Sequence, residues 1–350
     1  MTIEHAHCAT LCAALALCGC SGGGSNPAIV DDLAGCPDPT SVAPNDVFCI
    51  GLYHAKSSQQ TTASAQPYTP GAVLWSDGAE KQRYLQLPPD TSIDTSVWDA
   101  WKFPVDTKAF KEFRFGGKLL ETRMLWKQSA SNWVMATYVW DDAEKAATLN
   151  TSKTAVLLDT GYEIPTAKDC GKCHHGGSDK VLGVEAVALA LPTAKGLTLD
   201  ALAASGLLSD PPADTGIQLP EDDSGQAAAA LGFLHANCGM ACHSARGLGE
   251  ETKLVLRLRA EEFWTADGKA RTETVDMADA YTAGVAVVPT TAAVAQMFPG
   301  AQRITPGAHD QSLLWLLAHR RDKYQMPPLV SHKVDEPDSQ ALADWIDALP

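Results

Sequence analysis

Apolar and polar residues alternate along the first half of the chain in a pattern typical of strands. FKEFRF (110–115) is followed by a Gly-Gly pair, then by KLLETRMLW, a polar SASN stretch and WVMATYVW. Runs rich in aromatic and β-branched residues, separated by turn signals, predict an antiparallel meander. We therefore expect a β domain over residues 51–160, of the sandwich or barrel-like kind. In LWSDGAEKQRYLQLP, Trp75, Asp77 and Gly78 predict a turn that leads into a further strand.

From about residue 160 the periodicity becomes helical. GQAAAALGFLHAN (225–237) is rich in alanine, and Asp310 is placed to cap a helix in QSLLWLLAHR. Leu342, Trp345, Ile346 and Leu349 recur at helical spacing, and Pro337 suits the first turn of that last helix. The whole pattern predicts an α+β, multidomain chain, with an N-terminal antiparallel β domain followed by a mainly α-helical region.

A short apolar run, ATLCAALALCGC (9–20), is too brief to span a bilayer and is typical of an export signal. It ends in Leu17-Cys18-Gly19-Cys20, which resembles the box cleaved before the lipid-modified cysteine of bacterial lipoproteins. The resemblance implies a signal peptide at 1–19, lipidation of Cys20 and an outer-membrane rather than inner-membrane address. Plain secretion into the periplasm is the alternative.

Export places the chain in an oxidising compartment, where cysteines pair. We therefore expect Cys36 and Cys49 to form a disulfide that closes a short loop and stabilises the folded state by about 3 kcal/mol. Two free buried thiols are the alternative. Residues 20–50 are rich in Gly, Pro, Ser and Asp, so we expect a lipid-anchored tether and a disulfide loop there.

The four remaining cysteines form two pairs, each followed directly by a histidine. Cys170, Cys173 and His174 in CGKCHH have the spacing of a c-type haem attachment site. On a helical turn the two sulfurs face one side, where they can bond the vinyl groups of one porphyrin, and the histidine can bind the iron. With 10 Cys and 10 His in the chain, chance gives this pattern with a probability of roughly 1 in 124.

The second motif, in HANCGMACHS, contains one residue more. Cys238 and Cys242 are four residues apart, which still places both sulfurs on one helical face, and His243 follows. A local bulge would have to absorb the extra residue, and Gly239 is suited to give the backbone that freedom. The alternative for the four cysteines is structural zinc, although zinc needs no histidine after each pair.

A candidate sixth ligand for the second iron lies downstream. Met326 stands in YQMPPLVSHKVD, in a proline-containing loop just before the last amphipathic helix. A thioether held in such a loop is a suitable axial ligand, although a lone methionine is more often core filler.

At this point the chain resembles a known family. The segment from GFLHANCGMACHS through ITPGAHDQSLLWLLAHRRDKYQMPPL to ADWIDALP is similar to a class I cytochrome c domain. Together with LWSDGAEKQRYLQLP, FPVDTKAFKEF, LETRMLW, TYVWDD and KDCGKCHHG, roughly residues 70–350 resemble bacterial dihaem c-type cytochromes that carry an N-terminal β domain and have no settled role. The resemblance implies a haem 1 segment at 161–224 and a cytochrome c-like domain with haem 2 at 225–350. The family's second motif normally has two intervening residues, so the thioether to Cys238 is an open question.

These observations predict two haems c and electron transfer in the cell envelope, to a redox partner protein. The alternatives are a dihaem peroxidase with an open haem 1, a β domain that recognises a partner or glycan, and a zinc-stabilised binding protein. A net charge of −15 without clustered Lys and Arg argues against nucleic acid as a partner. No sixth ligand of haem 1 is evident from the sequence; the candidates are His54, His175, His235, His309, His319, His332, Met240, Met277 and Met297.

Overall fold

The structure is a computed structural model that describes residues 33, 35–36, 42–56, 58–175 and 179–350. The predicted signal peptide, Cys20 and most of the predicted tether lie outside the described residues.

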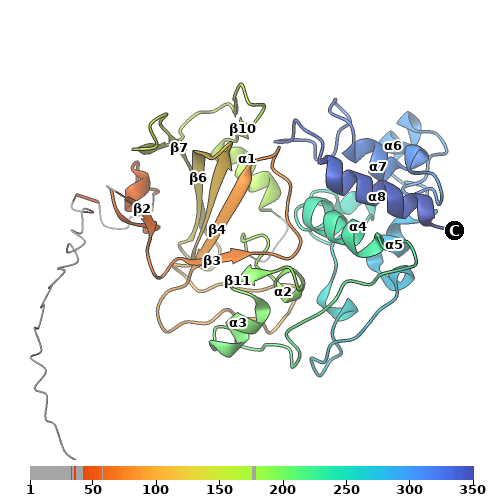
Figure 1. Ribbon diagram of the computed structural model, residues 1–350, viewed down its shortest axis with the longest axis horizontal. Helices are drawn as coiled ribbons and strands as arrows, with labels where there is room; N and C mark the ends of the chain where they lie inside the picture. The colour runs from red at the N-terminus through yellow and green to blue at the C-terminus, as the bar shows by residue number, and fades with distance from the viewer. Residues whose placement is uncertain (1–32, 34, 37–41, 57, 176–178) are drawn as a thin grey trace, which may run out of the picture. The chain divides into compact units, whose positions relative to one another are not determined.

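An antiparallel sheet of seven strands organises the first half of the described chain (Figure 1), in the order β11-β3-β4-β5-β6-β7-β8. Two further pairs, β1 with β2 and β10 with β9, form two-stranded sheets. The strands are β1 (Tyr53–Ala55), β2 (Ser58–Thr61), β3 (Gln66–Thr69), β4 (Glu80–Gln86), β5 (Lys108–Phe115), β6 (Lys118–Lys127), β7 (Trp133–Trp140), β8 (Ala147–Leu149), β9 (Val156–Leu157), β10 (Glu163–Ile164) and β11 (Lys195–Gly196).

The predicted meander is confirmed as β5, β6 and β7, which pair in sequence order. Gly116 and Gly117 connect β5 to β6 at φ angles of 58° and 83°, which a two-residue hairpin turn of the primed type requires. The expected sandwich of two large sheets or closed barrel is not found among the described strands, which form one open seven-stranded sheet and two two-stranded sheets. The edge strand β11 of the large sheet comes from the segment that follows the first Cys/His motif, so the sheet takes a strand from beyond residue 160.

The two faces of the sheet bury different sets of side chains because neighbouring residues of a strand point to opposite sides. One face packs against the segment that contains η1 (Val47–Cys49), and its core includes Phe110, Met124 and Tyr138. The other face carries an apolar row that packs against α2 and α3; this row includes Leu85, Ala109 and Leu125.

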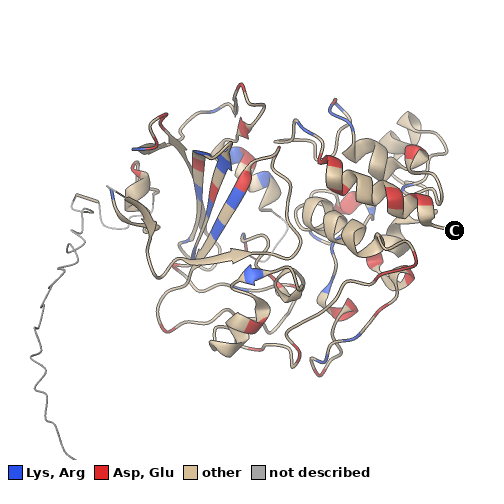
Figure 2. Cartoon of the chain, viewed as in Figure 1, with Lys and Arg blue, Asp and Glu red and all other residues tan. Residues whose placement is uncertain are grey.

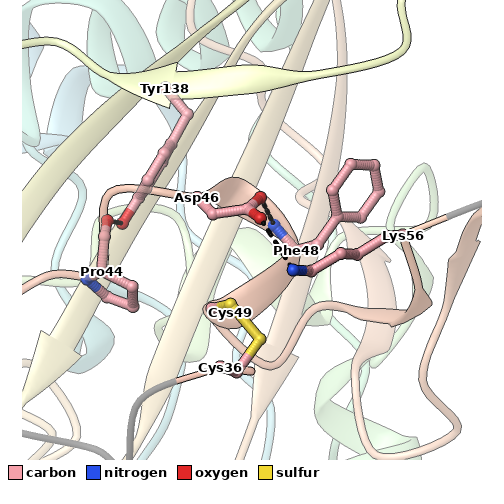
Figure 3. Close-up of a disulfide and its surroundings, with 7 residues drawn as sticks. All are labelled: Cys36, Pro44, Asp46, Phe48, Cys49, Lys56 and Tyr138. Atoms are coloured by element: carbon pink, nitrogen blue, oxygen red, sulfur yellow. Dashed lines mark hydrogen bonds and ion pairs between the residues drawn. A yellow bond between two sulfur atoms is a disulfide. The ribbon is translucent and has the colours of Figure 1, made fainter. Parts of the chain in front are cut away.

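The predicted disulfide between Cys36 and Cys49 is present, with its Cα atoms 5.3 Å apart (Figure 3). The disulfide lies beside η1, in the segment that packs against one face of the sheet. There the Tyr138 hydroxyl donates to the carbonyl of Pro44 at 2.8 Å, and the Asp46 carboxylate caps η1. The disulfide therefore connects Cys36 of the predicted disulfide loop to the segment that packs on one face of the sheet.

The helices follow mainly after residue 166, and α4 to α8 gather into one group (Figure 1). The α-helices are α1 (Ala167–Cys173), α2 (Ala186–Ala190), α3 (Leu199–Ala204), α4 (Ala227–Leu234), α5 (Asp279–Gly284), α6 (Ala292–Met297), α7 (Leu313–Ala318) and α8 (Glu336–Ala348). One π-helix, η2 (His235–Gly239), continues α4, and the short 3₁₀ turns besides η1 are η3 (Glu250–Thr252), η4 (Ala260–Glu262), η5 (Val275–Met277) and η6 (His309–Gln311).

The predicted amphipathic C-terminal helix is confirmed as α8, with Pro337 in its first turn. Leu342, Trp345 and Ile346 are fully buried against apolar residues of α4. The expected capping role of Asp310 is wrong: this residue lies inside η6, and Ser312 occupies the N-cap position of α7. The chain is thus α+β, with an antiparallel sheet followed by helices.

Candidate functional site

Both Cys/His motifs line one cavity of about 370 Å³. This volume is within the range of about 300–1,000 Å³ that is usual for small-molecule and cofactor sites. The cavity is bordered by α1, η2, strands β4 to β7 of the large sheet and the loop after α7. It brings together all seven residues that the sequence predicted for haem binding: Cys170, Cys173, His174, Cys238, Cys242, His243 and Met326.

The first motif is held on helix α1, whose start is fixed by a capping box. The Thr166 hydroxyl accepts from the Asp169 backbone N–H at 3.3 Å, and the Asp169 carboxylate accepts from the Thr166 N–H at 3.2 Å. Cys170 and Cys173 are then one turn apart on the same face of α1. His174 follows at the C-cap, with its backbone N–H 3.0 Å from the Cys170 carbonyl.

The His174 ring has a defined orientation that suits a metal ligand. Its Nδ1 hydrogen-bonds to the backbone carbonyl of Lys180, and because a carbonyl only accepts, Nδ1 carries the hydrogen. Nε2 is therefore left as the lone-pair nitrogen, which is the arrangement commonly found in ligating histidines. Burial, followed by the positive charge of Lys111, lowers the pKa of His174 to about 3 and keeps the ring neutral.

The extra residue of the second motif is accommodated by the π-helix η2. The backbone N–H of Met240 donates to the His235 carbonyl at 2.9 Å, and that of His243 donates to the Cys238 carbonyl at 2.9 Å. Both bonds span five residues, so one residue is inserted into the helical turn. The local bulge that the sequence required is thus present next to the motif.

Gly239 is needed in this turn for a reason other than the backbone freedom expected from the sequence. A Cβ at this position would lie 2.4 Å from the Arg257 backbone nitrogen and 2.5 Å from the Leu256 carbonyl carbon. Gly239 does not have a positive φ. It therefore permits the π-helix to pack directly against the backbone of the segment that follows the motif.

The second histidine also has a partner for Nδ1. Nδ1 of His243 lies 3.4 Å from the Thr252 hydroxyl, which itself donates to the Gly249 carbonyl at 2.7 Å. A hydroxyl that donates elsewhere acts as an acceptor here, so Nδ1 carries the hydrogen and Nε2 is free. Burial, with a smaller effect of Arg303, lowers the pKa of His243 and favours the neutral ring.

The four motif cysteines are kept as neutral thiols. Burial raises the pKa of Cys170 and Cys173, and it raises the pKa of Cys238 to about 12. Burial also raises the pKa of Cys242, with a further contribution from Cys173, so the two motifs lie within electrostatic range of one another. Thiolate nucleophiles and redox-active cysteines need a lowered pKa, and these residues have the opposite.

A turn of the β region positions the second motif and the Met326 loop. The backbone N–H of Trp75 donates to the Asn237 side chain at 2.7 Å, directly before Cys238. The Trp75 indole donates to the Lys333 carbonyl at 3.0 Å, and Asp77 accepts from the backbone N–H groups of His332 and Lys333. The sequence suggested only a turn here. Its long-range partners are more than 150 residues away and could not be inferred.

The structure separates the candidates for the sixth ligand of haem 1. His235 lines the cavity, but its Nδ1 accepts from the Leu258 N–H at 3.0 Å and its Nε2 pairs with Glu185 at 3.3 Å, so neither nitrogen is available. Met240 lines the cavity as well. The residues His54, His175, His309, His319, His332, Met277 and Met297 are not part of the cavity wall. Met135 of β7, which the sequence did not single out, is part of the wall.

Four basic side chains from three neighbouring strands also border the cavity: Lys81, Arg83, Lys111 and Arg123. Figure 2 shows Lys and Arg positions on neighbouring strands of the large sheet. Burial, with the neighbouring Arg83 and Arg123, lowers the pKa of Lys111 to about 7. Arg83 belongs to the LWSDGAEKQRYLQLP segment, in which the sequence pattern predicted only a turn and a strand. The alternation of side chains within each strand could not have shown that Arg83, Lys111 and Arg123 lie opposite one another across three strands.

No group of three or more His, Cys, Asp or Glu side chains in the described residues is arranged to hold a metal ion. A structural zinc site needs four such ligands, whereas a haem iron takes only one or two axial ligands from the protein. The zinc interpretation therefore has no ligand group among the described residues. In the same residues, no helix is both long and apolar enough to cross a membrane.

Comparisons with models of protein families, with curated proteins and with solved structures gave no match to this chain.

The residues around the cavity fit a haem group on three counts: paired thiols on one helical face, neutral histidines with a free Nε2, and a thioether from Met326. Such a group would supply one-electron redox chemistry at its iron, and His174 and His243 would hold it from the protein side.

Proposed function

We propose that the protein is a dihaem c-type cytochrome that transfers electrons in the cell envelope. The single observation that carries this proposal is the common cavity, which is lined by both Cys/His motifs and by Met326. The two motifs are 64 residues apart at their nearest residues, His174 and Cys238. That both line one cavity supports the interpretation that they serve one site.

Cys170 and Cys173 would hold haem 1 together with His174, and Cys238 and Cys242 would hold haem 2 together with His243 and Met326. The hydrogen bonds of the two histidines support their part in this proposal, since the Lys180 carbonyl orients the first ring and Thr252 orients the second.

Simple electron transfer is favoured over a peroxidase with an open haem 1. Besides Met326, three methionines line the cavity. Met124 is packed in the core on the other face of the sheet, which leaves Met135 and Met240 as candidates for a sixth ligand. A peroxidase would show a high-spin component and turnover with hydrogen peroxide; an electron carrier would be low-spin and would not turn peroxide over.

The deciding experiment is the haem content of protein matured in a host with c-type haem machinery, from the pyridine haemochrome spectrum and the intact mass. We expect two added haem masses in the wild type and one in each of the double variants C170A/C173A and C238A/C242A. The matched control C36S/C49S should retain both. A wild type without covalent haem would overturn the proposal.

The single variant C238A tests whether the extra residue permits a second thioether. If Cys238 is bonded, the α-band of haem 2 should shift in the variant; an unchanged band would mean that Cys242 alone attaches haem 2.

Export and anchoring complete the proposal. A lipid at Cys20 would hold the protein at the outer membrane, where a redox partner protein receives or supplies electrons. Metabolic labelling with palmitate should mark the wild type and not C20S; equal labelling or none in both would refute the anchor.

A further inference from the structure

A row of basic side chains crosses the sheet at the cavity wall. In the strand register Arg83 of β4 lies opposite Lys111 of β5, and Lys111 lies opposite Arg123 of β6. Directly opposed residues have Cβ atoms about 4.5–5.5 Å apart, and like charges at this distance destabilise a sheet. Three such positions in one row therefore need negative charge nearby.

Only one end of the row has its own counter-charge. Arg123 pairs with the buried Glu121 carboxylate, donates to the Tyr162 hydroxyl at 3.2 Å and lies over the Phe113 ring. Burial alone would lower the pKa of Arg123, but Glu121 more than offsets this and raises it. This arginine is thus a satisfied structural cation.

Arg83 and Lys111 differ from Arg123. Arg83 is 6% exposed and Lys111 is partly buried, and neither side chain forms a hydrogen bond or ion pair within the described part of the chain. Of the five acidic residues of the cavity wall, Asp169 pairs with Lys172, Glu163 pairs with His332, and Asp77 accepts from two backbone N–H groups. Asp335 lies near Lys81, and neither Asp335 nor Glu251 pairs with Arg83 or Lys111. A cation withdrawn from water without a partner is costly, so these two side chains point to a missing anion.

The row is close to the first Cys/His motif. Charges on Lys111 and Arg123 influence the pKa of Cys170, Cys173 and His174. Helix α1 packs against β7, the next strand of the same sheet, where Thr137 continues the row in register with Arg123. An anion held by this row would therefore lie beside the group attached at Cys170 and Cys173.

We propose that Arg83 and Lys111 form an anion-binding site on the cavity wall that holds a carboxylate or small oxyanion beside haem 1. The inference rests on the proposed function, since a haem carries two propionate carboxylates that need cations when they are buried. The second source of the same chemistry is a small oxyanion from solution that approaches haem 1. Guanidinium and ammonium groups together suit either anion, with the planar arginine able to bind two oxygens at once.

The test compares R83Q and K111Q with the wild type and with K118Q. Lys118 lies on β6, pairs with Asp142 at the surface and is not part of the cavity wall, so K118Q makes the same charge change elsewhere on the sheet. Each protein is assayed for haem content by intact mass, for the reduction potential of each haem by spectroelectrochemistry, and for binding of inorganic phosphate by calorimetry. Urea unfolding checks that each variant is folded, and K111Q carries the test if R83Q fails to fold.

If the anion is a propionate, R83Q and K111Q lower the potential of haem 1, because a nearby cation favours the reduced iron. K118Q leaves the potential unchanged, and phosphate has no effect. If the anion comes from solution, phosphate binds the wild type and K118Q saturably and binds R83Q and K111Q at least about tenfold more weakly, as expected for the loss of one charged hydrogen bond.

The anion site is refuted if R83Q and K111Q match the wild type in both the potential of haem 1 and phosphate binding. Absence of haem from the wild type would instead refute the proposed function. In that case phosphate calorimetry still decides the anion site: weaker binding by R83Q and K111Q supports it, and no binding or equal binding rejects it.

Discussion

The substitution Gly239→Ala tests whether the π-helix of the second motif depends on close backbone packing. The new Cβ would lie 2.4 Å from the Arg257 nitrogen, 2.5 Å from the Leu256 carbonyl carbon and 2.6 Å from the Arg257 Cα. All three atoms belong to the backbone, so no side-chain rotation can relieve the contact. Two chain segments must move apart.

The expected cost follows from these contacts. Overpacking a buried site costs about 1–3 kcal/mol, and a backbone obstacle places this position at the upper end of that range. Replacing a helical glycine by alanine returns roughly 0.5–1 kcal/mol through lower chain entropy. We therefore expect a net loss of about 2 kcal/mol in the free energy of unfolding, together with reduced haem content at the second motif.

Gly171 provides a matched control, since it follows Cys170 as Gly239 follows Cys238. A Cβ at Gly171 would have no heavy atom within 4 Å, and its helix is α1. Gly171→Ala should therefore leave stability unchanged or raise it slightly. The assay is urea unfolding followed by circular dichroism, with haem content from the haemochrome spectrum. Equal stability of the two variants would refute the packing argument.

Three further predictions concern other parts of the chain. Met326→Ala should convert haem 2 from low-spin to high-spin and lower its reduction potential, as measured by the absorption spectrum and a redox titration. The control Met277→Ala, at an exposed position outside the cavity, should change neither property. An unchanged spectrum in Met326→Ala would remove this ligand from the proposal. The C36S/C49S variant should lose about 3 kcal/mol in thermal or urea unfolding, because the bridge joins positions 13 residues apart and restricts the unfolded chain. A loss below about 0.5 kcal/mol would contradict a stabilising bridge. In the C170A/C173A variant, the free energy of unfolding should rise between pH 7 and pH 10. Burial lowers the pKa of Lys111 in the folded state to about 7, so across this pH range the unfolded state binds more protons than the folded state. Adding Lys111→Met should flatten that rise, and an identical pH profile would show that Lys111 does not titrate there.

Local patterns predicted the elements of this fold well because they depend on neighbouring residues. The alternation in FKEFRF and WVMATYVW marks strands, the Gly116-Gly117 pair marks their turn, and the spacing of Leu342, Trp345 and Ile346 marks the buried face of α8. Asp310 shows the limit of this reasoning. An acidic residue before an apolar run resembles an N-cap, but a short 3₁₀ turn precedes α7 and moves the cap to Ser312.

Long-range contacts within the cavity could not be predicted because they depend on the arrangement of distant segments. The Cys/His spacing predicted the two motifs as candidate attachment sites, but it could not indicate that both motifs line one cavity. Asp77 was recognisable as a turn residue, yet it also holds the backbone of His332 and Lys333, and no sequence signal links positions so far apart. Similarly, the register that places Arg83 opposite Lys111 is fixed by hairpin geometry and packing rather than by either strand alone.

Two local features among the described residues depart from ordinary folding rules and border the same cavity. A π-helix replaces regular α-helix at Cys238. Arg83 and Lys111 are basic side chains without an acidic partner, on a sheet face whose neighbouring row of side chains belongs to the apolar core. Each departure costs stability by itself, and neither is needed to complete the sheet or to pack α4 against α8. Natural sequences depart from local consistency mainly where function requires it. If the cavity holds the proposed group, substitutions at the two basic side chains and in the π-helix should change binding by a different amount from folding stability.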